Sequence, residues 1–592
     1  MRPQTVISAL TRYHVIWIVA FVLALTVPLV PHSHFYGDDY IQIGTLEGTF
    51  DQFGSPPFDL YRFADGSTER MKRLIETGPF PWFVHPEMKT HFFRPVSSAL
   101  LTLDHALFGR HVQLYRIQAI LWYLLLVLAF WAWMCRMIPT TGRRIWAVPV
   151  LALLIFAVSD SHWSNVLWTA GRWVLMAATL ALLACVAHLR WRMEGWRPGR
   201  YLSVVFAALA LLSGEVSLAV FSYLVAFEII ATGGKAKERA MALVPFAVLI
   251  GVYLIFYISV GFGAAATDDY VNPLVYPAAY LDQLPVRLLA MCGEVFLWFP
   301  ARMWNVEPLR GTTELAGVGG LVYLTVLLVP VWLASSARER IAIGRLLLGT
   351  FASMLVLAAG SPGSRNLVIP FIGASALVGI ALYHWWMILR RKRGVIQWTA
   401  ALVCLTIVFI HLGLAPYRWF TEPSQFRTSS DTQANMIRNL DVTNENVPDQ
   451  RTVFLKMHFN ACWNGYFLRK FEGLPMPTCW WTISAADCEH RYHRTEPDRL
   501  VLETIGGEMM TTWLESVVRS ASLPIPKGDT VNLHGLSVTV LEVGDHGPTK
   551  VELTFDRSLD HSSMNFMAVL DGELRRVEPP PVGGTLTLRS PW

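Results

Sequence analysis

The stretch "HVIWIVAFVLALTVPLVPHSHFYGDDYIQ", residues 14–42, places a long apolar run directly before two adjacent carboxylates, Asp38 and Asp39. A helix needs roughly 20 apolar residues to cross a hydrocarbon core, and the run supplies nearly that number. Arg2 and Arg12 precede it, as in a signal peptide, but no small-residue cleavage motif follows. The stretch therefore predicts an uncleaved first span, with the acidic pair where the chain leaves the membrane.

The composition extends this interpretation to the whole chain. Of its 592 residues, 53% are hydrophobic and only 16% are charged. This balance is typical of a polytopic membrane protein and argues against a soluble enzyme. The basic residues fall in short clusters between apolar runs, which also argues against nucleic-acid binding.

Eleven apolar runs are candidate spans, so the predicted fold is a polytopic α-helical membrane protein of about eleven transmembrane helices. The runs are 14–31, 114–137, 145–159, 166–187, 201–213, 216–231, 240–262, 316–334, 344–360, 367–389 and 396–414.

The basic loops predict the orientation. Loops rich in Lys and Arg alternate with loops poor in them, and the positive-inside rule makes the basic ones cytoplasmic. The N-terminus is then inside, residues 32–112 form a long first outer loop, and residues 415–592 lie outside. The basic residues are Arg143, Arg144, Arg190, Arg192, Arg197, Arg200, Lys235, Lys237, Arg239, Arg338, Arg340, Arg345 and the run "LRRKRG" at 389–394.

Two segments do not fit a simple pattern of crossings. The run 201–231 is broken at Ser213–Glu215 into arms of about 13–16 residues, which reach only roughly 20–24 Å as helix. Glu215 is therefore expected below the outer surface, in a cavity shielded from lipid. The segment 286–304 is apolar, but the alternation of inner and outer loops does not allow it to cross the membrane. We therefore expect an interfacial or re-entrant helix at the outer face.

After residue 414 the polarity rises and short strand-like segments replace the long apolar runs. We therefore divide the chain into a membrane domain, 1–414, and a β-rich extracytoplasmic domain, 415–592. Three cysteines of this second domain predict one disulfide with one thiol left over, in a pairing that the sequence leaves open. They are Cys462, Cys479 and Cys488.

The predicted topology gathers charged and polar side chains at the outer face. Arginine offers a planar fork of donors for phosphate oxygens, and a carboxylate at a partly dehydrated interface can act as a general base. A basic pocket between helices can hold a lipid phosphate. The set predicts group transfer from a lipid-linked phosphate, and it comprises Asp38, Asp39, His91, Arg94, His162, Arg172 (about 10 Å inside the fourth span), Glu215 and Arg365.

Six segments in order over roughly residues 10–390 also carry a family resemblance. They are "YGDDYI", "FFRPVSSALLTLDHALFG", "HWSNVLWTAGR", "LLSGEVSLAV", "VNPLVY" and "SRNLVIPFIG". In these the chain resembles the multi-spanning GT-C glycosyltransferases that use polyprenyl-phosphate sugars, most of all the branch of the O-mannosyltransferases and their TMTC relatives.

The resemblance implies roles for the outer-face residues. Asp38 is the favoured catalytic base, with Asp39 as its support or as a metal or substrate contact. The donor phosphate would be held by three arginines, and three further residues would line the substrate cavity. The arginines are Arg172, Arg365 and Arg94, and the cavity residues are His162, Glu215 and His91, for which a structural role is the alternative.

The sequence departs from that family pattern in three places. Ser164 stands where relatives have an acidic residue, Gly214 stands where they have a basic one, and the tandem helical repeats of the TMTC branch are absent. These departures leave the acceptor open, together with any requirement for a divalent metal such as Mg²⁺ or Mn²⁺.

The sequence thus predicts an inverting glycosyltransferase of the inner, cytoplasmic membrane of a bacterium, with its C-terminal domain in the periplasm. The donor would be a polyprenyl-phosphate sugar and the acceptor a hydroxyl of a glycan, lipid or protein. A transporter or flippase of a lipid-linked or anionic substrate is the main alternative, since charges inside the membrane and a broken hairpin would serve it too. A receptor that uses the β-rich domain is the third.

Overall fold

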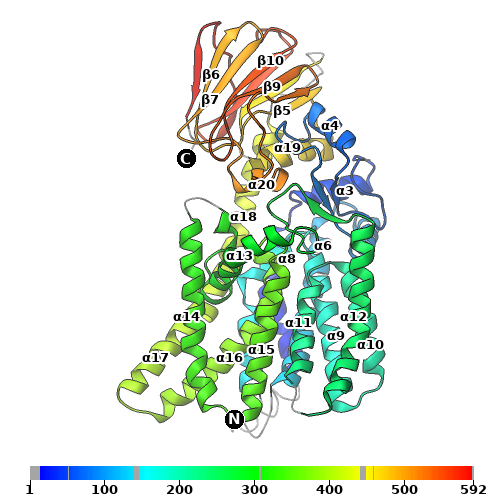
Figure 1. Ribbon diagram of the computed structural model, residues 1–592, viewed down its shortest axis with the longest axis vertical. Coiled ribbons are helices and arrows are strands. Elements are labelled where there is room, and N and C mark those ends of the chain that lie inside the picture. The colour runs from blue at the N-terminus through cyan, green and yellow to red at the C-terminus, as the bar shows by residue number, and fades with distance from the viewer. Residues whose placement is uncertain are drawn as a thin grey trace.

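The computed structural model describes residues 14–50, 52–138, 146–230, 233–305, 309–440, 449–457 and 459–589. A bundle of long helices forms one end of the elongated molecule and a β-rich part forms the other (Figure 1). This arrangement confirms the predicted class, an apolar helical bundle with a C-terminal β-rich region.

Each of the eleven predicted runs overlaps a helix, but only some of these helices are long enough to span. Among the described residues, eight helical segments pass by length and apolar composition, or nine if one bent pair counts as a single span. They are His14–His32 (α2 and η1), Val112–Met137 (α6), Trp173–Glu194 (α9), Ala236–Ser259 (α12), Arg310–Ala334 (α14), Ala337–Leu357 (α15), Val368–Arg391 (α16), Val395–Arg438 (α17 to α18), and the pair Ala147–Ala157 (α7) with Asp160–Leu167 (η3 and α8), bent by 51°.

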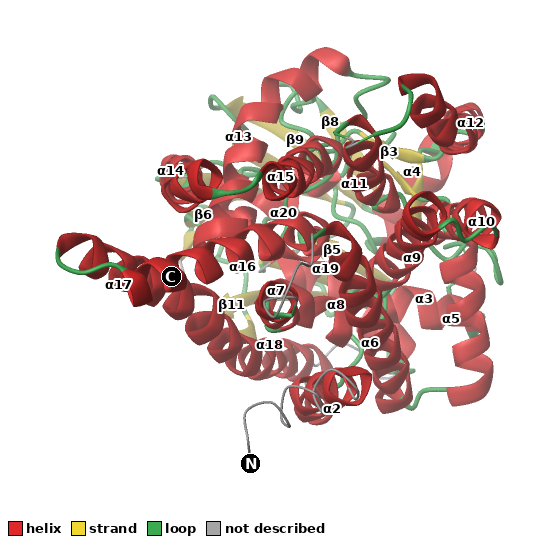
Figure 2. Ribbon diagram, turned by 90° about the horizontal axis from the view of Figure 1, so that it is seen from below, coloured by secondary structure: helices red, strands yellow, loops and turns green. Residues whose placement is uncertain are grey.

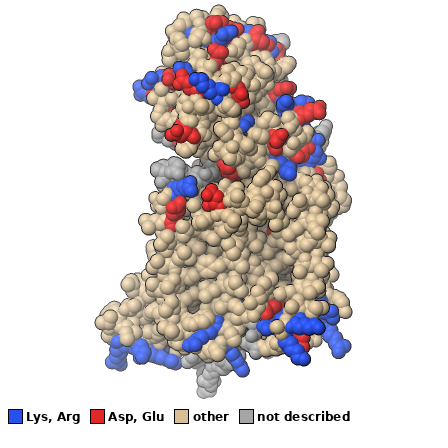
Figure 3. Space-filling model, in the orientation of Figure 1, with Lys and Arg blue, Asp and Glu red and all other residues tan. Residues whose placement is uncertain are grey.

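Burial separates central from peripheral helices. Most of α9 and α16 is buried inside the molecule, whereas α12 and α17 expose most of their apolar side chains. Helices that are hydrophobic on all sides need an apolar surrounding, which neighbours supply in the centre and lipid supplies outside. Figure 3 shows the corresponding tan band, with charges above it and mainly Lys and Arg along the lower end. The basic end is the one that the positive-inside rule assigns to the cytoplasm.

The two irregular segments form helices that stay short or stay at one end. Pro198–Ser213 (α10) and Ser217–Ile229 (α11) are the two arms of the broken hairpin, and Glu215 lies in the turn between them. Pro277–Leu297 (α13) is not among the candidate spans and lies at the end of the bundle that faces the β-rich part (Figure 1).

One continuous helix links the bundle to the β-rich part. Val395–Val408 (α17) passes through a π-helical turn, Phe409–Leu414, into Ala415–Arg438 (α18). The domain boundary expected at residue 414 therefore lies inside a helix of 44 residues. The change in polarity at this point marks where side chains become exposed to water, and such a change does not by itself end a helix.

Two sheets make up the β-rich part. A six-stranded sheet has the order β13-β6-β7-β10-β9-β8, and a four-stranded sheet has the order β12-β11-β4-β5, in which β4 runs parallel to both neighbours. The strands are Arg451–Lys456 (β4), Cys479–Thr482 (β5), Glu489–Glu496 (β6), Arg499–Ile505 (β7), Thr530–Leu533 (β8), Leu536–Val543 (β9), Pro548–Phe555 (β10), Met564–Leu570 (β11), Glu573–Arg576 (β12) and Thr585–Leu588 (β13), with helices Phe459–Phe471 (α19) and Trp513–Val518 (α20).

The first loop, residues 32–112, and the β-rich part share one hydrophobic core. The Trp82 indole donates to the Ile483 carbonyl at 2.8 Å, and the Phe50 and Phe467 rings lie 5.5 Å apart. The two segments are thus one folded unit. The loop contributes Asp38–Leu46 (α3), Thr68–Thr77 (α4), Pro95–Phe108 (α5) and the strands Arg62–Asp65 (β1) and Lys89–His91 (β2), which pair into a small sheet with Gly263–Ala265 (β3).

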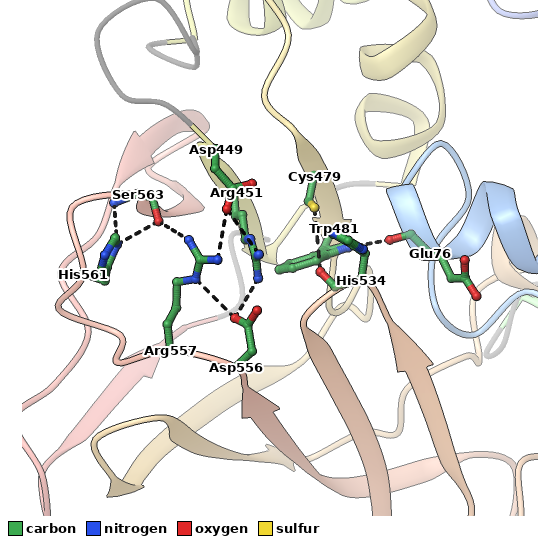
Figure 4. A network of polar contacts seen from close by, with 10 residues as sticks. All are labelled: Glu76, Asp449, Arg451, Cys479, Trp481, His534, Asp556, Arg557, His561 and Ser563. Carbon is green, nitrogen blue, oxygen red and sulfur yellow. Dashed lines mark hydrogen bonds and ion pairs between the residues drawn. The ribbon is translucent and has the colours of Figure 1, made fainter.

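A polar network reinforces this unit (Figure 4). The buried Arg451 guanidinium pairs with Asp556 at 2.7 Å and with Asp449 at 3.3 Å. On the other side, the Trp481 indole donates to the Glu76 carbonyl of α4 at 3.1 Å. Trp480 and Trp481 are therefore core residues that join the β-rich part to the first loop.

The predicted disulfide is absent among the described side chains. Cys479 and Cys488 are both free thiols, and Cys479 lies 3.9 Å from the His534 carbonyl oxygen that it can contact as a weak donor. The side chain of Cys462 lies outside the described residues. Cys479 and Cys488 are instead small buried groups of the shared core.

Two glycines test the shared core. Gly78 has φ +97°, and a Cβ there would lie 1.5 Å from the Trp480 carbonyl oxygen, whereas Gly48 has φ +74° and open space around it. Both Ala variants lose about 1 kcal/mol from backbone strain, but only Gly78→Ala must also push the β-rich part away. We expect Gly78→Ala to lower the midpoint of thermal unfolding in detergent far more than Gly48→Ala. Equal shifts would contradict the close packing of α4 on β5.

Candidate functional site

Asp39 is a structural anchor rather than a free acid. Its side chain is 1% exposed, and its two oxygens accept from the backbone N–H of Ala170 at 2.6 Å and of Tyr36 at 3.2 Å. Burial raises the pKa of Asp39 to about 7, while the two N–H donors and the Arg116 guanidinium act in the opposite direction. The carboxylate thereby ties the start of α3 to the turn that precedes α9.

Asp38, the first residue of α3, is held differently. Gly37 before it has φ +57°, a value that favours glycine, and this turn sets the direction of the Asp38 side chain. The carboxylate is partly exposed and accepts no hydrogen bond from any described residue. Burial raises the pKa of Asp38 to about 6, and the nearby cations of Arg365 and Arg94 lower it. Asp38 is therefore an acid with its oxygens free and two guanidinium groups facing it.

Arg94 is fixed in place by a carboxylate and by aromatic rings. Its Nε donates to Glu215 Oε2 at 2.8 Å, and its guanidinium lies 3.5 Å from the centre of the Trp173 ring. The other Glu215 oxygen accepts from the Tyr257 hydroxyl at 3.1 Å. These contacts leave the two terminal nitrogens of Arg94 without a hydrogen-bond partner among the described residues. The turn of the short hairpin therefore positions an arginine whose free donors face the site.

Arg365 lies in a short 3-10 turn, Ser364–Asn366 (η5), just before α16. It receives only weak support, a 3.4 Å contact with the Tyr270 hydroxyl and a position 4.9 Å from the centre of the Trp168 ring. Tyr270, which no sequence motif indicates, is half-buried, and its pKa is raised by desolvation while the Arg365 cation acts to lower it. Arg365 thus keeps most of its donors available.

Arg172 has a different position from the one predicted. The helix α9 begins at Trp173, so Arg172 is its N-cap residue instead of lying inside a span. Its guanidinium donates to Asp104 at 2.5 Å, and both side chains are almost completely buried. Residues 169–172 form a turn, so α9 begins later in the chain than the predicted residue 166. Arg172 is therefore neutralised by Asp104, a pairing that the sequence did not reveal.

The two histidines have surroundings of their own, and neither is among the charged groups that act on the Asp38 carboxylate. His162 is fully buried among the rings of Tyr123, Phe156 and Phe371, and neither ring nitrogen has a partner among the described residues. His91 lies on β2 and pairs with Asp59 at 2.9 Å. The structure thus brings together Asp38, Arg94, Glu215 and Arg365, while His162 and His91 occupy packed positions of their own.

A second acidic pair is also structural. The Asp268 carboxylate accepts from the Ser520 hydroxyl at 2.5 Å and from the Ala521 N–H at 2.8 Å, so it binds the loop before Tyr270 to the β-rich part. The Arg287 guanidinium donates to the backbone oxygens of Asp268 and Asp269 on the same loop.

The site combines two guanidinium groups with two carboxylates. Arg94 and Arg365 face Asp38, and Glu215 pairs with Arg94, so the four charges sum to zero when Asp38 is ionised. The terminal nitrogens of Arg94 and most donors of Arg365 remain available to phosphate oxygens. Among the described residues no group of three or more His, Cys, Asp or Glu side chains could hold a metal ion. The described arrangement thus offers a free carboxylate and arginine donors.

No family model and no curated protein matches this chain. Several solved structures resemble it in fold. ArnT from Cupriavidus metallidurans, bound to undecaprenyl phosphate, is 13% identical over 78% of this chain and 85% of its own, with a TM-score of 0.37. The oligosaccharyltransferase AglB from Archaeoglobus fulgidus, in complex with an inhibitory peptide and a dolichol-phosphate, is 11% identical over 79% and 65%, with a TM-score of 0.43. The arabinofuranosyltransferase AftD from Mycobacteria is 13% identical over 95% and 41%, with a TM-score of 0.37.

The unequal roles of the two aspartates can be tested by stability. Asp39→Asn replaces one acceptor oxygen with an NH₂ group that cannot accept from a backbone N–H, which costs about 1–3 kcal/mol when the site is buried. Asp38→Asn breaks no hydrogen bond to the described part of the chain. We expect Asp39→Asn to lower the thermal unfolding midpoint in detergent and Asp38→Asn to leave it within error of the wild type. The opposite order would reverse the assignment of anchor and free acid.

Proposed function

We propose that this chain is an integral membrane glycosyltransferase that moves a sugar from a polyprenyl-phosphate donor to an acceptor hydroxyl. The observation that carries the proposal is the Asp38 carboxylate, which has no hydrogen-bond partner among the described residues and faces Arg365 and Arg94. The apolar bundle beneath it offers a place for a lipid tail. A free base, anion-binding donors and a lipid-facing scaffold are the three requirements of this reaction.

The proposed step is a direct displacement. Asp38 removes the proton from the acceptor hydroxyl as that oxygen attacks the anomeric carbon. The bond between this carbon and the phosphate oxygen breaks, and the polyprenyl phosphate leaves with the electron pair. Attack from the face opposite the leaving group inverts the configuration at the anomeric carbon. A carboxylate with a pKa of about 6 is ionised at neutral pH and remains basic enough to share the proton.

The arginines would stabilise the negative charge that develops on the phosphate. Arg365 and the free end of Arg94 can donate to its oxygens, and the Glu215 and Trp173 contacts keep Arg94 in position before the substrate arrives. Arg172 supports the site instead of binding the donor, because Asp104 already occupies it. Glu215 acts through Arg94.

The finer assignment follows the sequence resemblance. We propose a bacterial-type GT-C enzyme of the O-mannosyltransferase and TMTC-like branch, with the site and the β-rich part on the periplasmic face and the N-terminus in the cytoplasm. The acceptor would be a hydroxyl of a glycan, lipid or protein.

A transporter or flippase is the second candidate, because polar groups also lie buried toward the other end of α9. His188 contacts Glu228 at 2.7 Å, and Arg192 donates to the same carboxylate at 2.8 Å. These charges neutralise one another, whereas Asp38 keeps its oxygens free. The unused carboxylate favours the enzyme.

The reaction can be tested with purified protein in detergent and a panel of polyprenyl-phosphate sugars. We expect release of polyprenyl phosphate in the presence of a cell-envelope extract, and a fall of about 10²–10⁴-fold in rate for Asp38→Asn, as for loss of a general base. Glu47→Gln, which changes an acid at the opposite end of the same helix that pairs with Arg110, serves as the control. Saturable binding of polyprenyl phosphate without release from any donor would support the transporter instead.

The pH dependence tests the role of Arg365. The reaction needs Asp38 ionised, so kcat/KM should fall below about pH 6, where the carboxylate takes up a proton. Removal of the Arg365 cation makes ionisation of Asp38 less favourable and raises its pKa. We therefore expect Arg365→Gln to move the acidic limb of the profile to higher pH and to lower the rate. An unchanged acidic limb, as expected for the exposed control Arg310→Gln, would separate Arg365 from Asp38.

A further inference from the structure

A second hollow lies beside the helix that carries Asp38. It has a volume of about 120 Å³ and is formed where α3, α18, α19 and the segment before α3 meet. Asp38 and Tyr40 are two positions apart on α3, so their side chains leave the helix in roughly opposite directions. Only Tyr40 lines the hollow, which separates it from the Asp38 site. Its lining residues are His34, Phe35, Tyr40, Ser430, Asp431, Ala434, Arg438, Phe471 and Glu472.

The charges around the hollow cancel one another. Arg438 and Glu472 form a two-point ion pair, with N–O distances of 2.6 and 2.8 Å. Asp431 accepts from Arg427 at 3.1 Å, one turn earlier on α18. An anion or a cation would therefore find no opposite charge that is free. The Asp38 site differs in that arginine N–H donors there have no hydrogen-bond partner among the described residues.

Several polar atoms in the hollow remain unused. His34 Nδ1 bonds to the His32 carbonyl at 2.9 Å, and burial lowers the pKa of His34, so its buried Nε2 is an acceptor without a partner among the described residues. The Tyr40 and Ser430 hydroxyls likewise make no hydrogen bond to the described part of the chain. Of these atoms only His34 Nε2 is fully buried, and a buried polar atom without a partner calls for a ligand or water; the two hydroxyl oxygens keep some accessible surface.

Aromatic rings line the same hollow. The Phe471 ring lies 5.4 Å from that of Tyr40 and 6.0 Å from that of Phe35. Aromatic rings and hydrogen-bonding groups that lie side by side match a neutral sugar ring. Its C–H faces can pack on the aromatic rings, and its hydroxyls can form hydrogen bonds with the polar atoms. The volume of about 120 Å³ is compatible with one such ring.

We propose that this hollow is a secondary carbohydrate-binding site that holds a non-reacting sugar unit. It rests on the proposed function in one respect, because the sugar unit would belong to the acceptor glycan. Since α18 continues the membrane helix α17 and α3 begins at Asp38, the site lies where the bundle, the catalytic segment and the β-rich part meet. A sugar bound there would raise the affinity for the acceptor without taking part in the chemistry.

The test is direct binding to the full chain in detergent, with maltose, cellobiose and α-1,6-mannobiose at millimolar concentration, read by saturation-transfer NMR. We expect transfer from at least one disaccharide, weakened about threefold to tenfold by Tyr40→Phe and by Ser430→Ala through loss of one hydrogen bond each. Ala434→Leu, which fills the hollow, should abolish it. Ser429→Ala, on the exposed side of α18, is the matched control and should bind like the wild type.

The same measurement on Asp38→Asn separates this inference from the proposed function. Binding that survives in Asp38→Asn and is lost in Ala434→Leu supports the hollow as a sugar site even if no donor is turned over. No transfer from any disaccharide, transfer that Ala434→Leu leaves unchanged, or displacement by inorganic phosphate would overturn it. Where turnover is measured, Ser430→Ala should raise KM for the acceptor and leave kcat unchanged.

Discussion

The Asp39 carboxylate is the contact on which the candidate site depends. It accepts from two backbone N–H groups that are 134 positions apart in the chain, those of Tyr36 and Ala170. A buried carboxylate is costly unless such donors surround it, and here they also fix the first turn of α3. The adjacent Asp38 is held in place by the backbone alone and keeps its oxygens free. One acid of the pair thus holds the backbone together, and the other makes no hydrogen bond to the described residues.

A similar division of roles recurs among the arginines. A guanidinium buried without a partner is expensive, so Arg172 is paired with Asp104 and Arg94 with Glu215. Arg94 nevertheless keeps its terminal nitrogens free, because Glu215 takes only its Nε and the Trp173 ring supports its face. Arg365 is held most loosely of the three. The three arginines therefore differ in how many of their N–H donors are already used, and Arg94 and Arg365 keep the most donors for an anionic ligand.

The β-rich part is integral to the site's surroundings. It shares its core with the first loop, residues 32–112. Its loop at Ser520 binds Asp268, which lies two positions before Tyr270 in the chain, and the Tyr270 hydroxyl contacts Arg365. The long helix from Val395 to Arg438 joins it to the bundle without a break, and Arg418 on this helix pairs with Asp160 at 3.0 Å. The β-rich part is therefore connected to the residues around Asp38 both through a continuous helix and through side-chain contacts.

The sequence by itself determined the membrane-type bundle, the positions of its helices, the broken hairpin at Glu215 and the strands after residue 450, because hydropathy and strand patterns are local. It also selected Asp38, Arg94, Glu215 and Arg365, because charged groups beside apolar runs stand out. It could not assign Asp39 as an anchor, pair Arg172 with Asp104, or find Tyr270, Arg116 and the hollow at Tyr40. Those features depend on contacts between segments more than 60 residues apart, whose partners only the tertiary structure brings together.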